Sequence, residues 1–113
     1  MELNFNKSKK QFFTVILPDE EQTKLLVKMP TKGLLDKVLA LKDDVDEMDE
    51  ESIFQIYEVT AEILNRNVGN KKITVKEIGE LLDFEDLFVL FNAYVEFIAG
   101  VSNQKNLKSP TIR

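Results

Sequence analysis

The longest apolar pattern in the chain runs from Asp83 to Val101 and predicts a single helix. On a period of 3.6 residues its large side chains fall on two neighbouring stripes, which together cover about half of the circumference. One packed face needs only about 100°. The helix therefore lies at the centre of a small bundle or also offers a surface to a partner. The first stripe contains Phe84, Leu87, Phe88, Phe91, Val95 and Ile98, and the second stripe contains Leu90, Tyr94, Phe97 and Val101.

Alternating apolar positions near the start of the chain predict a small antiparallel sheet. Leu3 and Phe5 alternate with polar residues, residues 11–17 are aromatic and β-branched, and residues 24–29 alternate cleanly. Polar turn segments separate these three strands, so we expect a β-meander. The middle strand is apolar on both faces, which is typical of a strand covered on both sides. Helices should cover one face, and a partner chain is a candidate cover for Phe12 and Ile16 on the other.

Three shorter helices are predicted between this sheet and the long helix. Thr31 is a suitable N-cap for a helix that ends near residue 42. A second apolar pattern of helical period covers residues 50–67. A third helix starts at the capping-box pattern Thr74 to Glu77 and ends near residue 82. Asp83 can then cap the long helix.

Together these elements predict an α+β fold, with a small N-terminal antiparallel β-meander followed by a three- to four-helix bundle. The last long helix should be its central element. We expect a single domain over residues 1–101. Residues 102–113 are polar and contain Pro110, which predicts a disordered C-terminal tail.

Composition excludes several classes of function. The 113 residues include no Cys and no His, which removes disulfides, thiolate catalysis and imidazole base chemistry. The net charge of −5 disfavours nucleic acid and anionic membranes as partners. No apolar run approaches the roughly 20 residues of a membrane span, and the first residues lack a signal core, so we expect a cytoplasmic location. No cofactor and no enzymatic activity are predicted.

The acidic run at residues 43–51 has two interpretations. A Ca²⁺ loop would need oxygen ligands at alternate positions and a central Gly. If Asp44 is the first ligand, Met48 falls where the third ligand belongs and Asp49 falls where the Gly belongs. A solvated loop whose later acids start the next helix is favoured, and no metal site is predicted.

Two further patterns have the spacing of a functional site, but their residue types do not suit the function. Residues 73–89 have the outline of a helix-turn-helix, but the second helix would bring Phe84, Glu85 and Asp86 to an anionic groove. The carboxylate pairs Asp83/Asp86 and Glu58/Glu62 have the spacing of an acid and a base, yet a chain with 20 acidic residues contains such pairs by chance. We favour core helices and a solvated surface in both cases.

The second stripe of the long helix is the strongest candidate surface. Cover by another helix of the same chain is the favoured interpretation. The alternative is a surface for an amphipathic partner helix or for self-assembly. The candidate partner-binding residues are Leu90, Tyr94, Phe97, Val101, Phe12 and Ile16.

Four segments of the chain form a further pattern. They are VKMPTKGLLD at residues 27–36, ILNRN at 63–67, KKITVKEIGELLD at 71–83 and LFxLFxAYxEFI at 87–98. Together they resemble the tail assembly chaperones of long-tailed bacteriophages and prophages of Gram-positive hosts. The resemblance covers about residues 3–106 and rests on ordered elements and apolar signatures.

The resemblance implies a non-catalytic role. Proteins of this family bind the tape measure protein, a long helical polypeptide that sets tail length, and keep it soluble while tail tube subunits polymerise around it. It implies action as a homo-oligomer in the host cytoplasm, absence from the mature virion, and the tail tube protein as a second partner. Many members also exist as a longer frameshifted product. The competing hypothesis is an acidic protein-binding adaptor without a tail role.

Overall fold

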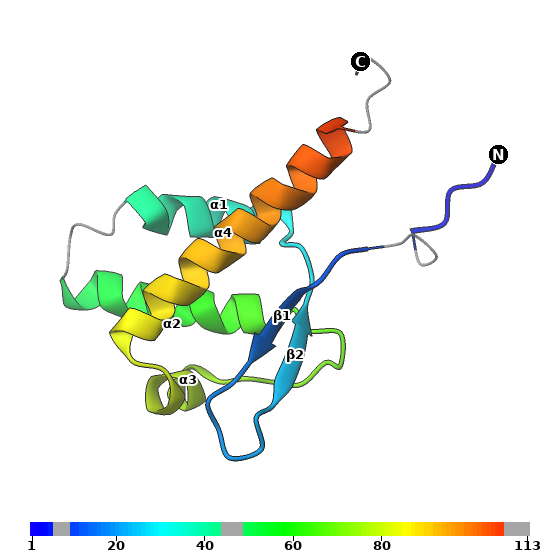
Figure 1. Cartoon of the computed structure of the whole chain (residues 1–113). Coiled ribbons are helices and arrows are strands. Elements are labelled where there is room, and N and C mark those ends of the chain that lie inside the picture. The colour runs from blue at the N-terminus through cyan, green and yellow to red at the C-terminus, as the bar shows by residue number, and fades with distance from the viewer. Residues whose placement is uncertain (6–9, 44–48, 108–113) are drawn as a thin grey trace.

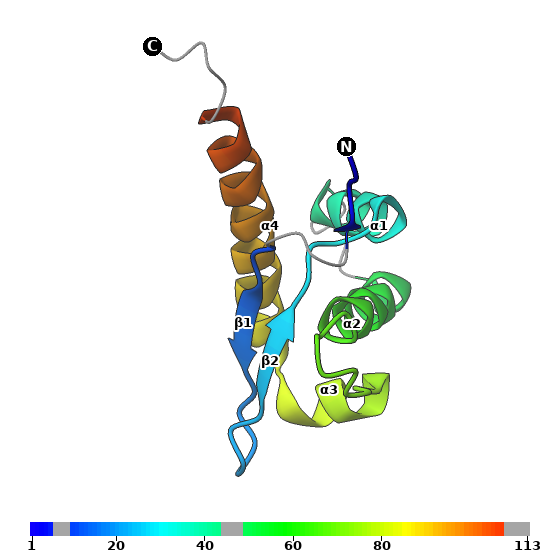
Figure 2. The same cartoon turned by 90° about the vertical axis from the view of Figure 1, so that its right-hand side faces the viewer.

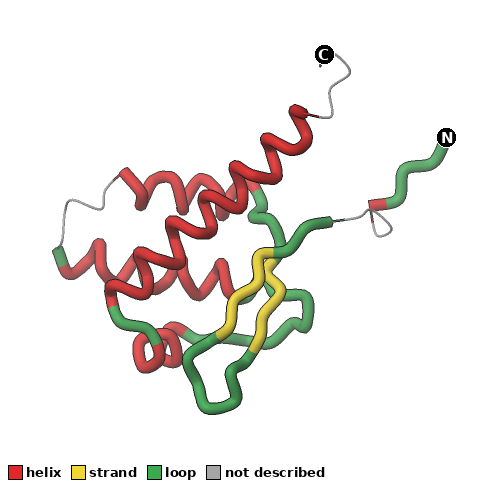
Figure 3. Tube along the Cα trace, in the orientation of Figure 1, coloured by secondary structure: helices red, strands yellow, loops and turns green. Residues whose placement is uncertain are grey.

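The structure is a computed structural model that describes residues 1–5, 10–43 and 49–107. It contains a two-stranded antiparallel sheet followed by four helices, which confirms the predicted α+β class (Figures 1 and 3). The elements are β1 (Phe13–Ile16), β2 (Lys24–Val27), α1 (Lys32–Asp43), α2 (Glu50–Leu64), α3 (Val75–Leu81) and α4 (Phe84–Leu107).

The elements form two layers. Figure 2 shows α1, α2 and α3 stacked in one layer, with α2 in the middle, while α4 and the hairpin form the other layer. Helix α2 packs against α1, α3, α4 and β2. The prediction that the last long helix is central was therefore wrong, because α2 is the helix that reaches both layers.

The sheet differs from the predicted meander. The expected first strand at Leu3 and Phe5 does not form, and both side chains are exposed. Instead, residues 66–68 return from the end of α2 and pair with the free edge of β2. Lys28 N–H donates to the Arg66 carbonyl at 2.8 Å, and Val68 N–H donates to the Leu26 carbonyl at 2.9 Å. The sequence pattern could not reveal this pairing, because it joins segments about 40 residues apart.

The hairpin turn is held by its own side chains. Asp19 accepts hydrogen bonds from the Thr23 hydroxyl at 2.6 Å and from Thr23 N–H at 2.8 Å. These bonds hold the pKa of the Asp19 carboxyl below its ordinary value. Gln22 adopts a left-handed conformation with φ of 51°, which lets the chain reverse before β2.

The predicted helix starts agree with the structure. Thr31 accepts from Leu34 N–H, and Asp49 accepts from Ser52 N–H at 2.7 Å as the N-cap of α2. The capping box of Thr74 and Glu77 is formed in full. The last acids of the acidic run thus start α2, as the solvated-loop interpretation expected, whereas residues 44–48 lie outside the described residues.

Two helix ends were misplaced by the sequence pattern. Helix α2 ends at Leu64 instead of residue 67, because two asparagine side chains replace the helical hydrogen bonds. Asn65 exchanges two hydrogen bonds with Ile73, and Asn67 donates to the carbonyls of Leu64 and Lys71 while accepting from Lys71 N–H. Helix α4 continues to Leu107, so the predicted disordered tail from residue 102 begins as helix. Residues 108–113 lie outside the described part of the chain.

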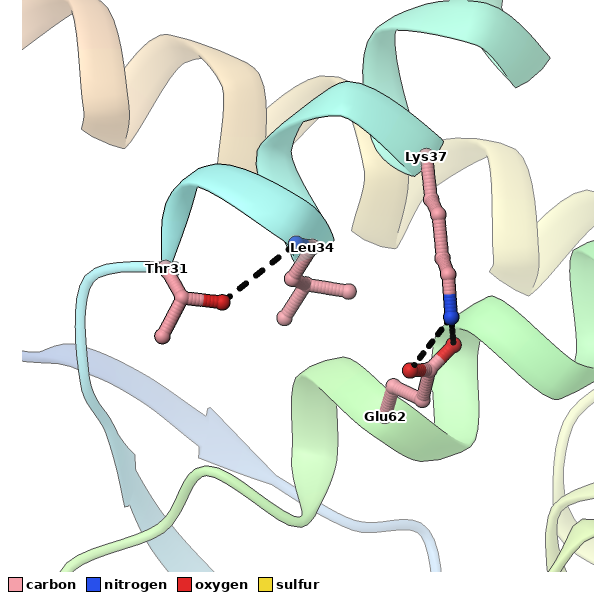
Figure 4. Close-up of polar contacts among 4 residues, drawn as sticks. All are labelled: Thr31, Leu34, Lys37 and Glu62. Carbon is pink, nitrogen blue, oxygen red and sulfur yellow. Dashed lines mark hydrogen bonds and ion pairs between the residues drawn. The ribbon is translucent and has the colours of Figure 1, made fainter.

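A surface ion pair links α1 to α2. Lys37 Nζ lies 3.0 and 3.2 Å from the two carboxylate oxygens of Glu62 (Figure 4). Both side chains are about half exposed, so the pair contributes at most about 1 kcal/mol. The two helices are held mainly by the buried side chains beneath it, which include Val38, Leu41, Val59 and Ile63.

Candidate protein-binding surface

The second stripe of α4 is covered by the same chain. Leu90, Tyr94 and Val101 are buried, and Phe97 is partly buried. Strand β1 covers Tyr94 and Phe97, where we expected a helix. The Phe13 ring lies 5.4 Å from the Tyr94 ring and 5.7 Å from the Phe97 ring, centroid to centroid. The prediction that these four residues form a free partner-binding surface was therefore wrong, because they are buried or partly buried within the chain.

Tyr94 fastens α4 to the hairpin. Its side chain is 0% exposed, and its hydroxyl donates to the Lys28 carbonyl at 3.0 Å. Burial raises the pKa of the Tyr94 hydroxyl to about 12, although the nearby Arg66 charge opposes part of the rise. The neutral hydroxyl satisfies a backbone carbonyl next to β2, so Tyr94 stabilises the packing of α4 against the hairpin.

Phe12 and Ile16 lie on the opposite face of β1 and are exposed, with Ile16 62% exposed. Leu26 in β2 faces the same side, because it pairs with Thr14 between them. Val68 lies beside Leu26 and is also exposed. We call these four residues, Phe12, Ile16, Leu26 and Val68, the hairpin outer face.

Positive charge borders the hairpin outer face. Lys24 pairs with Ile16, and Lys28 follows Leu26 on the same side of the strand, by the alternation of β-strand side chains. In a chain of net charge −5, this face is therefore locally basic. An apolar face with basic neighbours suits a partner that combines apolar and acidic residues.

A groove runs beside the hairpin, between β1 and α4. One wall is residues 13–18, and the other is formed by Leu82, Asp86, Val89 and Ala93. Its volume is about 440 Å³, and most of its surface is apolar. Val89 is 64% exposed, so the groove is open to solvent. We call it the edge groove.

Two features of this surface escaped the sequence analysis. Leu26 breaks the alternation of β2 by placing an apolar side chain among lysines, a signal that could have been used. Val68 and the edge groove depend on the return of residues 66–68 and on the position of α4. No local pattern encodes either one.

The residues considered above for catalysis, metal binding or DNA binding have structural roles wherever the structure describes them. Asp83 and Asp86 cap α4 reciprocally, each accepting from the other's backbone N–H at 2.8 and 3.0 Å. Within the described ranges, no three acidic side chains gather as metal ligands would. The apolar residues Ile73, Ile78 and Leu87 of the helix-turn-helix outline are buried in the core. None of the helices in the described part of the chain is both long and apolar enough to cross a bilayer.

Comparisons with protein families, with curated proteins and with solved structures found no match to this chain. The surface geometry and the sequence resemblance are therefore the basis for a functional proposal.

Proposed function

We propose that this protein is a non-catalytic chaperone of phage tail assembly, which binds the tape measure protein and keeps it soluble during tail tube assembly. The hairpin outer face is the observation that carries the binding role. It exposes four large apolar side chains on the hairpin and on the adjoining residues 66–68. Binding proteins need such a surface, whereas isolated exposed apolar residues carry no such meaning.

The charge distribution supports a holding role. A chaperone must cover apolar segments of its client and still remain soluble as a complex. The −5 net charge favours solubility, while the lysines beside the hairpin outer face reduce repulsion of acidic client segments. Action in the host cytoplasm as a homo-oligomer, with the tail tube protein as a second partner, belongs to the same proposal.

Co-expression with the tape measure protein of the same phage tests the proposal. The soluble fraction of the tape measure protein should rise several-fold when this chain is present. A double variant, Phe12→Ser with Ile16→Thr, should abolish the effect, since Thr keeps the β-branched side chain that suits a strand.

The matched control is Leu39→Ser with Phe54→Ser, which removes two exposed apolar side chains from α1 and α2. The control should retain full activity. If the tape measure protein stays equally insoluble with and without the chain, the chaperone proposal fails. Binding to an unrelated protein through the same face would then favour the acidic adaptor.

A further inference from the structure

We propose that β1 accepts an extended segment of the client as an additional β-strand, and that this segment lies in the edge groove. The inference deepens the proposed function, on which it rests for the identity of the client, and it concerns a stretch of that long helical polypeptide that is extended when bound. The binding mode itself follows from the backbone of β1, the lining of the groove and its charge.

The hydrogen-bond pattern leaves open the edge of β1 that faces away from β2. Leu17 N–H donates to the Thr23 carbonyl, so Leu17, Val15 and Phe13 turn their backbone groups toward β2. Thr14 and Ile16 must turn theirs the other way. The other edge of β2 shows the same alternation, since Leu26 and Lys28 bond to residues 66–68.

The backbone N–H groups of Thr14 and Ile16 donate to no backbone carbonyl of the described residues. Two donors and two acceptors thus face the groove in the alternating arrangement of a sheet edge. Exposed edges of this kind pair readily with another extended chain, and several peptide-binding domains use them.

The edge groove lies where an added strand would lie, since such a strand sits about 4.8 Å from its neighbour. The groove volume of about 440 Å³ is within the range of ligand-binding clefts. Figures 1 and 2 both place β1 on the α4 side of the hairpin, so an entering segment would lie between the strand and the helix.

The lining defines the chemistry of the segment. Alternate side chains would face Leu82, Val89 and Leu90, which favours Val, Ile or Leu at every second position. Asp86 is the charged residue of the lining, and the chain has a net charge of −5. Beside Asp86 in the groove, a Lys or Arg of the client segment is therefore favoured over an acidic residue, whereas acidic client residues are favoured beside the lysines of the hairpin outer face.

A second copy of this chain fits the groove less well. Helix α4 packs under β1 through Tyr94 and also lines the groove beyond its edge. If two β1 strands paired symmetrically, each α4 would lie under the partner's β1. The partner's own α4 already occupies that place.

Hydrogen exchange followed by NMR tests the proposal on the full chain. The probe is a blocked hexapeptide, Lys-Val-Thr-Val-Thr-Val, and its control is the same peptide with every backbone amide nitrogen methylated. The amides of Thr14 and Ile16 should exchange at least about tenfold more slowly when the probe is present, and not with the methylated control, which cannot donate.

Two variants separate the backbone from the side chain. Thr14→Pro removes one edge N–H and should weaken probe binding about tenfold, the effect of losing roughly 1.4 kcal/mol. Thr14→Val has nearly the same shape, retains the N–H, and should bind the probe as the unaltered chain does. Circular dichroism verifies that Thr14→Pro is folded. If Thr14→Pro is not folded, Val89→Lys provides the second test. This variant should weaken binding of the probe, because it places a cation in the groove without changing the sheet.

Unchanged exchange of both amides with the probe would overturn the proposal. Protection that appears without probe and rises with protein concentration would also overturn it, in favour of a second copy. Protection at all concentrations that disappears when residues 1–9 are deleted would assign the edge to the chain's own N-terminus. If Thr14→Pro still solubilises the tape measure protein, this inference fails while the proposed function stands.

Discussion

The two strands of the hairpin have similar composition and different surroundings. β2 is paired on both edges, by β1 on one side and by residues 66–68 on the other, and Leu25 and Val27 are buried beneath it. β1 is paired on one edge, and its inward-facing Phe13 and Val15 are only partly buried. The outer faces of the two strands do not differ in this way, since Ile16 and Leu26 are both exposed. The strand whose second edge is completed by a distant segment is therefore the one with the fully buried inner face.

The largest effect should come from removing the side chain that holds both strands to α4. We expect Tyr94→Ala to lower the free energy of unfolding by about 3–5 kcal/mol, since it opens a cavity beneath Phe13 and leaves the Lys28 carbonyl without its partner. Urea denaturation measures the change. Phe12→Ala, on the hairpin outer face, is the control and should change stability by less than about 0.5 kcal/mol. Equal losses would contradict the distinction between the two faces.

The pairing of β2 with residues 66–68 depends on the buried side chain of Asn67. Asn67 is paired with Val27 and makes three hydrogen bonds that hold residues 64–71 in place. We expect Asn67→Ala to cost about 2–3 kcal/mol, because it leaves buried backbone groups without partners. Thermal or urea unfolding of Asn67→Ala measures this cost, with Asn92→Ala on the exposed side of α4 as the control. A cost no greater than that of the control would show that β2 does not need this loop.

The two edges of β1 can be compared directly by moving a proline along the strand. Val15→Pro removes an N–H that faces β2 and should cost about 1–3 kcal/mol. Thr14→Pro removes an N–H that faces the open edge and should cost much less. Urea denaturation of both variants measures the difference. If Thr14→Pro proves the more damaging of the two, the assignment of the edges is inverted.

The last effect concerns pH and accumulates gradually. The Tyr94 hydroxyl keeps its proton to about pH 12 in the folded state, whereas an ordinary tyrosine ionises near pH 10. The raised pKa means that its stabilising contribution is complete below pH 10 and is lost as the pH rises toward 12. Relative to Tyr94→Phe, the unaltered chain should lose up to about 1.4 kcal/mol per pH unit in this interval. Parallel stability curves for the two proteins would argue against a protonated, buried hydroxyl.

Several local features could be predicted because they depend on neighbouring residues. Thr31, Thr74 and Asp83 lie where their side chains can accept from the first turn of a helix, so they mark helix starts whatever surrounds them. The α+β class followed from the change of period between residues 29 and 31. The end of α2 was misjudged because Asn65 and Asn67 form their hydrogen bonds with residues 71 and 73.

The helix starts, the apolar stripes of α4, the two faces of β1 and the lack of Cys and His could all be read from the residues alone. The cover of Tyr94 and Phe97 by β1, the pairing of residues 66–68 with β2 and the open edge of β1 beside α4 became known only from the folded chain. The two groups of features differ in the range of the interactions that produce them. Caps and periodicity act over one or two turns, whereas burial and edge pairing depend on which remote segment occupies the neighbouring space.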